Sequence, residues 1–499
     1  MPTTRVCGAE KKQFFRLTFL EFNDIIKWIM TKRGFDMSKF IKILSFFLTV
    51  LILLSACQTA AAEIVPEYET DYGSDDLGGM TVKWLKWADD CPLGYLEGTA
   101  LSDVAMQRKS SVENRLNCKI ELVSSNGADT GGLISGSVMS GVLFSDVFLG
   151  GTFGLVTHMR AGYLLGLSSY LDASDTEKWG TPNMLQSLLW NNDLYGVVPY
   201  AWPELLYTSF GYPIAVCEEL IKQYGRTDPR EYVENGTWTW DRFETALQEY
   251  TVQENGRTIY GFATHKPYFS MMMFLSNGVT LSDFEDGKVV CGAYTDRGFT
   301  ALSRAREIYY ETCADCIHPD DPWGGVGIDM IVNKDVFLVP LPTNEIFRGT
   351  DSVLYRASDV GILPFPLGPD ATPNTYKSYH ESLDFATVIP ANEKEPEAVV
   401  AIISAMYEPF DEFKTKDDII NYMSSNVFFD ERDANIVATM LKNTEYGFFL
   451  EGGRSVIESS IESGTPLSTH LESYKARYDE IVEKYMIHHY SARLAVYGE

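Results

Sequence analysis

Short apolar runs alternate along the chain with longer segments in which apolar residues recur every three or four positions. The run MTVKWLKW (80–87) predicts a strand, and the segment after it predicts a helix with one apolar face. That face carries Leu101, Val104, Ala105, Val112 and Leu116. The runs CKIELVS (118–124) and SDVFLGG (145–151) predict the next two strands. Strands that alternate with helices in this way indicate βαβ units and mostly parallel sheets.

The same alternation continues through the rest of the chain. Thr239 is a candidate N-cap for a helix that carries Phe243, Ala246, Leu247 and Tyr250 at helical spacing. Further strand patterns occupy residues 191–207, 259–265, 335–344 and 358–370. Further helix patterns occupy residues 396–410 and the segment with Leu471, Tyr474, Tyr478, Ile481 and Tyr485. The pattern as a whole predicts an α/β protein of two lobes.

The most apolar stretch, residues 43–54, lies near the N-terminus. It is shorter than the roughly 20 residues that a membrane-spanning helix needs. The basic residues Lys39 and Lys42 precede it, which is typical of a secretory signal peptide, here over residues 37–56. Residues 1–36 are then an extension in front of the signal, and of the two possible starts, Met1 and Met37, we favour Met37.

The sequence Leu54-Ser55-Ala56-Cys57 resembles the lipobox of bacterial lipoproteins, which is cut before a cysteine that carries diacylglycerol. The resemblance implies that acyl chains such as palmitate on Cys57 anchor the protein to a membrane surface. Residues 57–79 are small, acidic and turn-rich, which predicts a flexible tether. An ordinary cleaved signal or a short buried helix is the alternative.

The charge of the chain excludes some partners. It has 41 basic and 69 acidic residues, and residues 1–56 hold 9 and 4 of these, which leaves 32 basic against 65 acidic. Nucleic-acid binding needs a basic surface, so no nucleic acid is expected. Electrostatic adhesion to anionic lipid is excluded for the same reason. Aromatic residues make up 13% of the chain, which is a supply that a carbohydrate site could use.

Six cysteines follow Cys57, namely Cys91, Cys118, Cys217, Cys291, Cys313 and Cys316. An exported protein can form disulfides, but spacing alone does not give their pairing. The sequence Cys313-Ala-Asp-Cys316-Ile-His318 looks like half of a zinc site, yet it lacks a second ligand pair. A local disulfide or two free thiols are the favoured interpretations.

No catalytic motif is present. The sequence has no Gly-x-Ser-x-Gly elbow, no phosphate-binding loop and no His-Glu-x-x-His pair. The adjacent acids Asp89 and Asp90 and the pair His488-His489 are better explained as solvated surface groups in so acidic a chain. We therefore expect no enzyme activity, no cofactor and no metal.

Five segments in order resemble the extracellular solute-binding proteins of sugar-type ABC importers, the maltose-binding-protein superfamily. They are SDVFLGGTFGLVTHMRAGYLLGLSSYLD (145–172), NDLYGVVPYAWP (192–203), TWTWDRFETALQEYT (237–251), YGFATH (260–265) and DVGILPFPLGPD (359–370). The resemblance covers residues 80 to 490. It departs from the family at Asp193, where a glycine is usual, and at FLVPLPTNEIF (337–347), which lacks the family's Ala-Met strand and Gly-x-Trp.

The resemblance implies a two-lobe periplasmic-binding-protein-like fold with a hinge and an interlobe cleft. Lobe one would comprise residues 80–196 and about 360–425, and lobe two residues 197–359 and about 426–499. It implies a monomer on the outer face of a Gram-positive type cell membrane. Its partners would be a solute, expected to be a carbohydrate, and the permease subunits of an ABC transporter.

Ligands of open α/β sheets bind beyond the carboxyl ends of strands, which nominates residues here. The ligand-binding candidates are Trp87, Asp89, Gly151, Thr152, Phe153, Tyr200, Trp202, His265, Tyr268, Asn344, Glu345 and Tyr379, with Asp90, Phe269 and His380 beside them. Aromatic rings would cover sugar faces, and polar groups would bond the hydroxyls.

Two other functions stay open at this point. A surface-anchored carbohydrate-active enzyme would need a pair of acids with a raised pKa, and no spacing marks one. A ligand-sensing module for a membrane receptor would have the same sequence features as a transport protein.

Overall fold

The computed structural model describes residues 76–498 except 207–210, 286, 322–324, 344–352, 358, 381–382, 429, 447–454 and 463, and leaves out the side chains of residues 153, 354 and 355. All described residues belong to one compact unit, Tyr72–Glu499. The predicted signal peptide, Cys57 and most of the tether lie outside the described residues. Within the described part, no helix combines the length and the apolar character needed to cross a bilayer.

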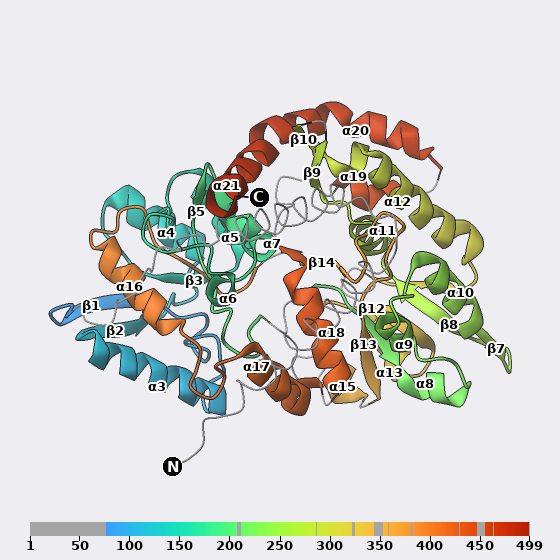
Figure 1. Ribbon diagram of the computed structural model, residues 1–499, viewed down its shortest axis with the longest axis horizontal. Coiled ribbons are helices and arrows are strands. Elements are labelled where there is room, and N and C mark those ends of the chain that lie inside the picture. Colours follow the sequence, from blue (N-terminus) through green and yellow to red (C-terminus); the bar gives the residue numbers. More distant parts are fainter. Residues whose placement is uncertain are drawn as a thin grey trace, which may run out of the picture. The chain divides into compact units, whose positions relative to one another are not determined.

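The first predicted βαβ unit is present. Strands β1 (Met80–Leu85) and β2 (Cys118–Val123) pair in parallel, with helix α3 (Ala100–Arg115) between them in the chain (Figure 1). The helix begins at Thr99, whose Oγ1 accepts a hydrogen bond of 3.3 Å from the amide of Ser102. Four of the five predicted apolar residues are buried, namely Leu101, Ala105, Val112 and the C-cap residue Leu116.

Strand β3 (Phe148–Gly150) follows as predicted and approaches β1 through the amide of Leu85, which donates 2.8 Å to the carbonyl of Val147. On its other side β3 pairs antiparallel with β15 (Ala386–Val388), far along the chain. Helix α16 (Pro396–Met406) follows β15 and packs against α3 (Figure 1). The first strands are therefore completed by a segment that returns from the second half of the chain.

A second sheet has six strands. Five lie in the order β11 (Ile317–Pro319), β8 (Arg257–Thr264), β12 (Val336–Pro340), β6 (Ile214–Cys217) and β13 (Val360–Leu363), and β7 (Val252–Glu254) pairs with β8. Strands β11, β8 and β12 are mutually parallel, as expected from the sequence. Strand β6 differs, because it runs antiparallel to β12 and β13.

Helix α10 (Trp240–Tyr250) packs on this sheet with all four predicted apolar residues buried. Thr239 is its N-cap, as predicted, and accepts a hydrogen bond of 3.4 Å from the amide of Arg242. A side chain at Gly261 of β8 would overlap the carbonyl of Leu247 in α10. The glycine of the YGF motif thus lets the helix lie directly on the strand.

The chain leaves the six-stranded sheet after β13. Pairing with β6 keeps Val360–Leu363 in the six-stranded sheet, and the return is complete at β15. We propose that lobe one resumes after residue 363, not at about 360, because a strand belongs with its paired neighbours.

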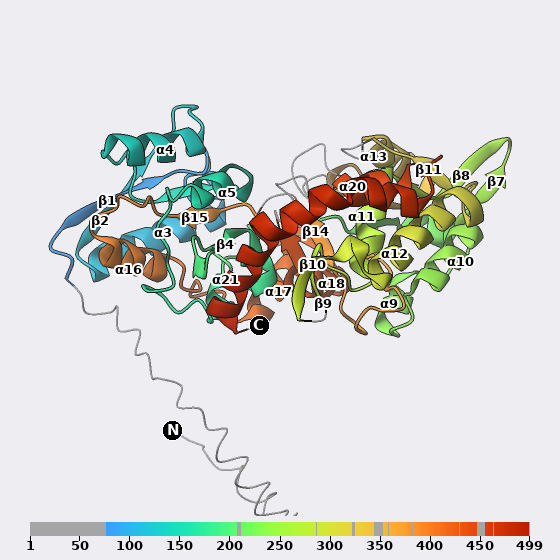
Figure 2. The ribbon, with the colours of Figure 1, turned by 90° about the horizontal axis from the view of Figure 1, so that it is seen from above.

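The C-terminal helices also connect distant elements. Helix α18 (Glu431–Lys442) contacts β13, and α20 (Leu467–Ile481) continues through residues 482–486 into α21 (Ile487–Tyr497) (Figure 2). Helix α21 contacts the hairpin of β4 (Leu189–Trp190) and β5 (Asp193–Leu194). The predicted long strand over residues 191–207 is instead this short hairpin and irregular chain, turned by Asn191 and Asn192 with φ of 47° and 68°.

Candidate functional site

Four strand ends meet at one edge of the six-stranded sheet. Ile214, at the start of β6, lies opposite Pro340 at the end of β12 and Leu363 at the end of β13. Strand β8 runs parallel to β12, so its carboxyl end points to the same edge. Residues that precede β6 and residues that follow the other three strands are therefore neighbours. Open α/β sheets bind ligands beyond an edge of this kind.

Three tyrosines gather at this edge, and we call them the tyrosine cluster. The rings of Tyr212 and Tyr268 have centroids 4.4 Å apart, and Tyr379 stacks on Tyr212 at 6.4 Å. Tyr268 lies in α11 (Lys266–Ser276), directly after β8, and His265 precedes that helix with its ring 5.0 Å from Tyr268. The structure thus brings the predicted His265, Tyr268 and Tyr379 together.

Two buried polar atoms lie near the cluster without a partner among the described residues. They are Nδ1 of His265 and Oγ1 of Thr343, which follows β12. Burial lowers the pKa of His265, against the opposing influence of Asp321 and Glu462, and favours the neutral ring. The amide of Thr343 donates 3.0 Å to the carbonyl of Gly211, which holds it beside Tyr212. A ligand hydroxyl could bond to either atom.

A second aromatic contact joins the end of β1 to a distant loop. Trp87 packs on Phe385 with ring centroids 4.6 Å apart, and we call these two the tryptophan pair. Phe385 has a φ of 59°, which is rare for a bulky residue. The amide of Thr152 donates 3.0 Å to the carbonyl of Leu383, and its Oγ1 accepts 2.9 Å from the Leu383 amide. Thr152, predicted as a ligand residue, is therefore part of the support for this loop.

Residues 378–385 connect the two aromatic groups within one stretch of chain. Strand β14 (Ser378–His380) pairs with β16 (Thr444–Tyr446), and Ser378 Oγ accepts 3.2 Å from the amide of Tyr212. Gly211 has a φ of 105°, and a side chain there would overlap Ser378 and the carbonyl of Tyr379. This close approach fixes the tyrosine cluster to the same segment that ends in Phe385.

The two hinge candidates have different surroundings. Tyr200 lines a cavity of about 230 Å³ together with Lys178, Phe413 and Lys416, and burial raises its pKa to about 12. Trp202 is 1% exposed and packs on Phe410 at 4.6 Å and on Tyr407 at 5.5 Å. We therefore leave Trp202 out of the ligand set, because its ring faces are used by the core.

The remaining candidates are not assembled into the site. Asp89 and Asp90 are exposed on a turn bridged by Ala88 and Cys91. Gly151 is the N-cap of α5 (Thr152–Arg160), and Phe269 is completely buried. His380 lies 5.9 Å from the ring of Tyr446. Asn344, Glu345 and the side chain of Phe153 lie outside the described residues.

Sequence reasoning missed Tyr212 and Phe385. The carboxyl-end rule considers only residues that follow a strand, and Tyr212 lies before a strand that runs the other way. Phe385 was not predictable because its contact with Trp87 joins segments about three hundred residues apart in the chain.

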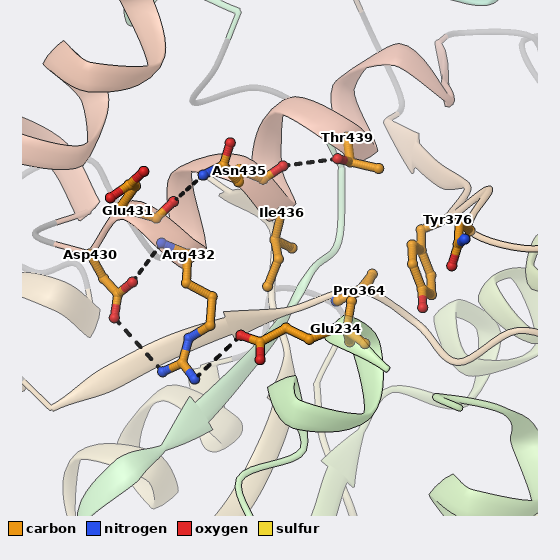
Figure 3. Close-up of a pocket in the computed structure, with 11 residues that line it drawn as sticks. Glu234, Pro364, Tyr376, Asp430, Glu431, Arg432, Asn435, Ile436 and Thr439 are labelled. Carbon is orange, nitrogen blue, oxygen red and sulfur yellow. Dashed lines mark hydrogen bonds and ion pairs between the residues drawn. The ribbon is translucent and has the colours of Figure 1, made fainter. Parts of the chain in front are cut away.

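A larger cavity of about 730 Å³ lies beside α18 and contains none of the predicted ligand residues (Figure 3). Arg432 forms ion pairs in it with Asp430 at 3.8 Å and with Glu234 at 3.9 Å, so its charge is already compensated. Tyr376 lines the cavity from the opposite side with a buried hydroxyl. Most residues that line this cavity are polar, and Tyr376 is the aromatic residue among them. The strand-end residues bring several aromatic rings together and are therefore the better candidate site.

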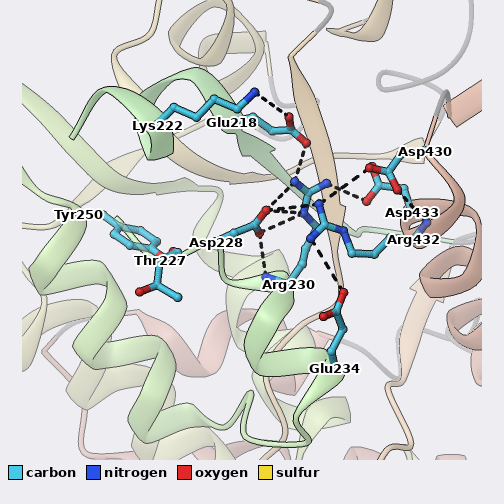
Figure 4. Close-up of polar contacts among 10 residues, drawn as sticks. All are labelled: Glu218, Lys222, Thr227, Asp228, Arg230, Glu234, Tyr250, Asp430, Arg432 and Asp433. Carbon is cyan, nitrogen blue, oxygen red and sulfur yellow. Dashed lines mark hydrogen bonds and ion pairs between the residues drawn. The ribbon is translucent and has the colours of Figure 1, made fainter. Parts of the chain in front are cut away.

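Next to this cavity a buried arginine holds α18 to the six-stranded sheet (Figure 4). Arg230 is 1% exposed and pairs with Asp228 at 2.7 Å, with Glu218 at 2.5 Å and with Asp433 of α18 at 3.0 Å. Burial lowers the Arg230 pKa, but these carboxylates outweigh it and raise the pKa overall. For Asp433 burial outweighs Arg230 and raises the pKa to about 6. We interpret this network as structural.

Solved structures with a similar fold are substrate-binding proteins. A cyclo/maltodextrin-binding protein complexed with maltotetraose matches with a TM-score of 0.56 at 10% identity, over 81% of this chain and 98% of that one. A sugar transporter from Rhizobium etli in an open conformation gives 0.57 at 15%, over 81% and 100%. An ABC substrate-binding protein from Listeria monocytogenes in complex with cycloalternan gives 0.52 at 12%, over 81% and 99%.

No family model matches the sequence, and no curated protein matches it either. At 10–15% identity the structural matches establish the fold and leave the ligand open. The three neighbours named above are described as binding or transport proteins. The chain has the mixed α/β fold of the maltose-binding-protein-like substrate-binding proteins of sugar ABC transporters.

Proposed function

We propose that the protein binds a sugar or oligosaccharide between the tyrosine cluster and the tryptophan pair. The observation that carries this proposal is the link between the two groups by residues 378–385, with buried polar atoms of His265 and Thr343 beside the tyrosines. Aromatic faces cover the C–H faces of sugar rings, and polar atoms that lack a partner favour a ligand rich in hydroxyls.

A neutral ligand suits this site better than a charged one. Burial favours the neutral form of the His265 ring, and the aromatic faces beside it carry no charge. In the similar structures the ligands are maltotetraose and cycloalternan, which are uncharged sugars, and this analogy rests on the fold alone. Which sugar binds depends on the side chains in this protein's own site, and a similar fold does not specify them.

We further propose that the two predicted lobes close around the ligand and that the closed form is recognised by an ABC permease. A ligand drives closure only through its higher affinity for the closed form. Cys57 would hold the protein beside the permease through its lipid, so that a captured sugar is released close to the membrane.

Calorimetric titration of the full chain with a panel of neutral mono- and oligosaccharides tests the binding step. We expect saturable binding by at least one sugar, and chromatography should recover that sugar intact. Binding of none of them would refute the sugar proposal, and hydrolysed product would replace it with an enzyme. The anchor is tested separately with Cys57→Ser, which should move the protein from the membrane fraction to the soluble fraction, with Cys7→Ser as control.

A further inference from the structure

The Cys313-Ala314-Asp315-Cys316 sequence forms a tight turn between a helix and the edge of the six-stranded sheet. Helix α12 (Asp296–Glu307) continues through residues 308–312, and the amide of Cys313 donates 3.0 Å to the carbonyl of Ile308. The amide of Cys316 then donates 2.8 Å to the carbonyl of Cys313, which closes the turn directly before β11. This geometry sets the two side chains beside each other.

The two thiols have different environments. Cys313 is fully buried, and its Sγ donates 3.8 Å to the carbonyl of Glu244. Cys316 is 8% exposed, and its thiol lies beside the side chains of Cys313 and Thr251. The side-chain interaction with Cys313 lowers the pKa of Cys316, although burial opposes it. The hydrogen bond with Cys316 and burial raise the pKa of Cys313.

A metal does not explain this arrangement. Among the described residues, no group of three or more histidine, cysteine, aspartate or glutamate side chains is placed to hold a metal ion. His318, the third residue of the zinc-like motif, has Nδ1 2.8 Å from the carbonyl of Pro319, and its ring packs 5.0 Å from Tyr260. The His318 imidazole therefore makes its contacts with its own strand and the neighbouring one.

We propose that Cys313 and Cys316 are a redox-active pair that cycles between dithiol and disulfide, with Cys316 as the attacking thiol. The oxidant is a disulfide, either of a small thiol or of a thiol–disulfide exchange protein. The Cys316 thiolate attacks one sulfur of that disulfide and displaces a thiolate, which gives a mixed disulfide. Cys313 then loses its proton and attacks Sγ of Cys316, and the second thiolate leaves. The pair loses two protons and two electrons, and the oxidant gains two electrons as two thiolates.

The division of roles follows from the surroundings. Attack requires a thiolate that the oxidant can reach, and Cys316 is the more exposed of the two. Cys313 is placed to resolve the mixed disulfide because the turn closed between its carbonyl and the Cys316 amide keeps the two residues side by side. A disulfide that closes so short a loop removes little chain entropy, so its stabilising effect is small and redox chemistry is the better explanation for the pair.

The pair also contacts the strand that leads to the candidate ligand site. The amide of Phe262 in β8 donates 3.1 Å to the carbonyl of Cys316, and the amide of Gly261 donates 3.2 Å to Thr251 Oγ1. Strand β8 ends directly before His265 and Tyr268. The redox proposal does not depend on sugar binding, and each can fail without the other.

The test uses the full chain, reduced with dithiothreitol and then equilibrated with oxidised glutathione. Mass spectrometry after alkylation should find the peptide that carries both cysteines lighter by two hydrogen atoms, and dithiothreitol should reverse the change. In the reduced protein at pH 7, Cys316 should alkylate about tenfold or more faster than the buried Cys217 and Cys291, whose thiols have raised pKa values.

Two variants separate the roles of the thiols. Cys313→Ser should accumulate a mixed disulfide with glutathione at Cys316, whereas Cys316→Ser should accumulate little at Cys313. Cys291→Ser is the matched control and should cycle like the wild type. The proposal is overturned if the wild-type pair stays reduced in oxidised glutathione, if both variants react equally, or if the purified protein retains zinc in a one-to-one ratio.

Discussion

The rings of Tyr212 and Tyr268 lie 4.4 Å apart, although 55 residues of chain separate them. They meet because β6 runs antiparallel to its neighbours, so that its amino end shares an edge with the carboxyl end of β8. Tyr268 is the partly exposed member of the cluster and therefore the ring that a ligand could cover.

Substitution of Tyr268 by alanine should weaken sugar binding by about 1–2 kcal/mol, or roughly 5- to 30-fold, because one stacking face is lost. Calorimetric titration of the variant with the sugar that the wild type binds measures the change. Tyr490→Ala is the matched control, since Tyr490 stacks on Phe284 at 4.9 Å in a different part of the chain. Equal losses in both variants would contradict the proposed site.

Gly211 should not tolerate a side chain. Its φ of 105° is unfavourable for alanine, and the added Cβ would overlap Ser378 and displace Tyr212. Gly211→Ala should therefore lower both the free energy of unfolding and the sugar affinity. Gly225→Ala tests strain alone, because Gly225 has a φ of 60° and open space around it, and it should cost about 1–2 kcal/mol without a change in affinity. Urea denaturation and titration of both variants give the comparison.

Removal of the buried Arg230 charge should destabilise the protein strongly. Arg230→Met leaves Asp228, Glu218 and Asp433 without their shared cation, and the loss of one member of a buried ion pair costs about 3–5 kcal/mol. Arg356→Met is the control, because Arg356 is 34% exposed and pairs at 2.9 Å with the exposed Asp329, outside this network, and surface ion pairs contribute about 0–1 kcal/mol. Similar midpoints in urea for both variants would show that the buried network has no special role.

Stability should fall in acid partly because of His489 in α21. Burial lowers the pKa of this ring from 6.5 to about 3, with Arg160 as a further cause, so the unfolded chain binds a proton that the folded chain does not. The contribution is fully present above pH 6.5 and is lost as the pH falls from 6.5 towards 3, at up to about 1.4 kcal/mol per pH unit.

The variant His489→Asn should flatten this part of the curve of unfolding free energy against pH. His488→Asn is the neighbouring control, because His488 is less buried than His489. Parallel curves for wild type and His489→Asn between pH 4 and 6 would show that the buried ring does not control acid stability.

Much of the fold could be predicted because local pattern decides it. The strands at residues 80–87, 118–124 and 259–265 and the helix after Thr239 were confirmed, since alternation and capping act within a few residues. Two features were not predictable. One is the direction of β6, and the other is the point at which the chain leaves the six-stranded sheet to pair again with β3. Both depend on pairing between residues far apart in sequence, which leaves no local trace.

The candidate site was predictable only in part for the same reason. His265, Tyr268 and Tyr379 follow the carboxyl-end rule or a recognisable motif. Trp202 looked equally suitable from its place after the hinge, but Tyr407 and Phe410, two hundred residues later, cover its ring. Whether an aromatic residue faces a ligand or the core depends on partners that only the folded chain supplies.

The segment from Tyr379 to Phe385 also limits the distance between the two aromatic groups. Six peptide steps span at most about 20–22 Å when fully extended. If the two proposed lobes separate, Tyr379 and Phe385 stay within that reach, because the chain joins them and each belongs to one of the aromatic groups. The length of a few residues would thereby limit the distance that a bound sugar has to span to touch both of these rings.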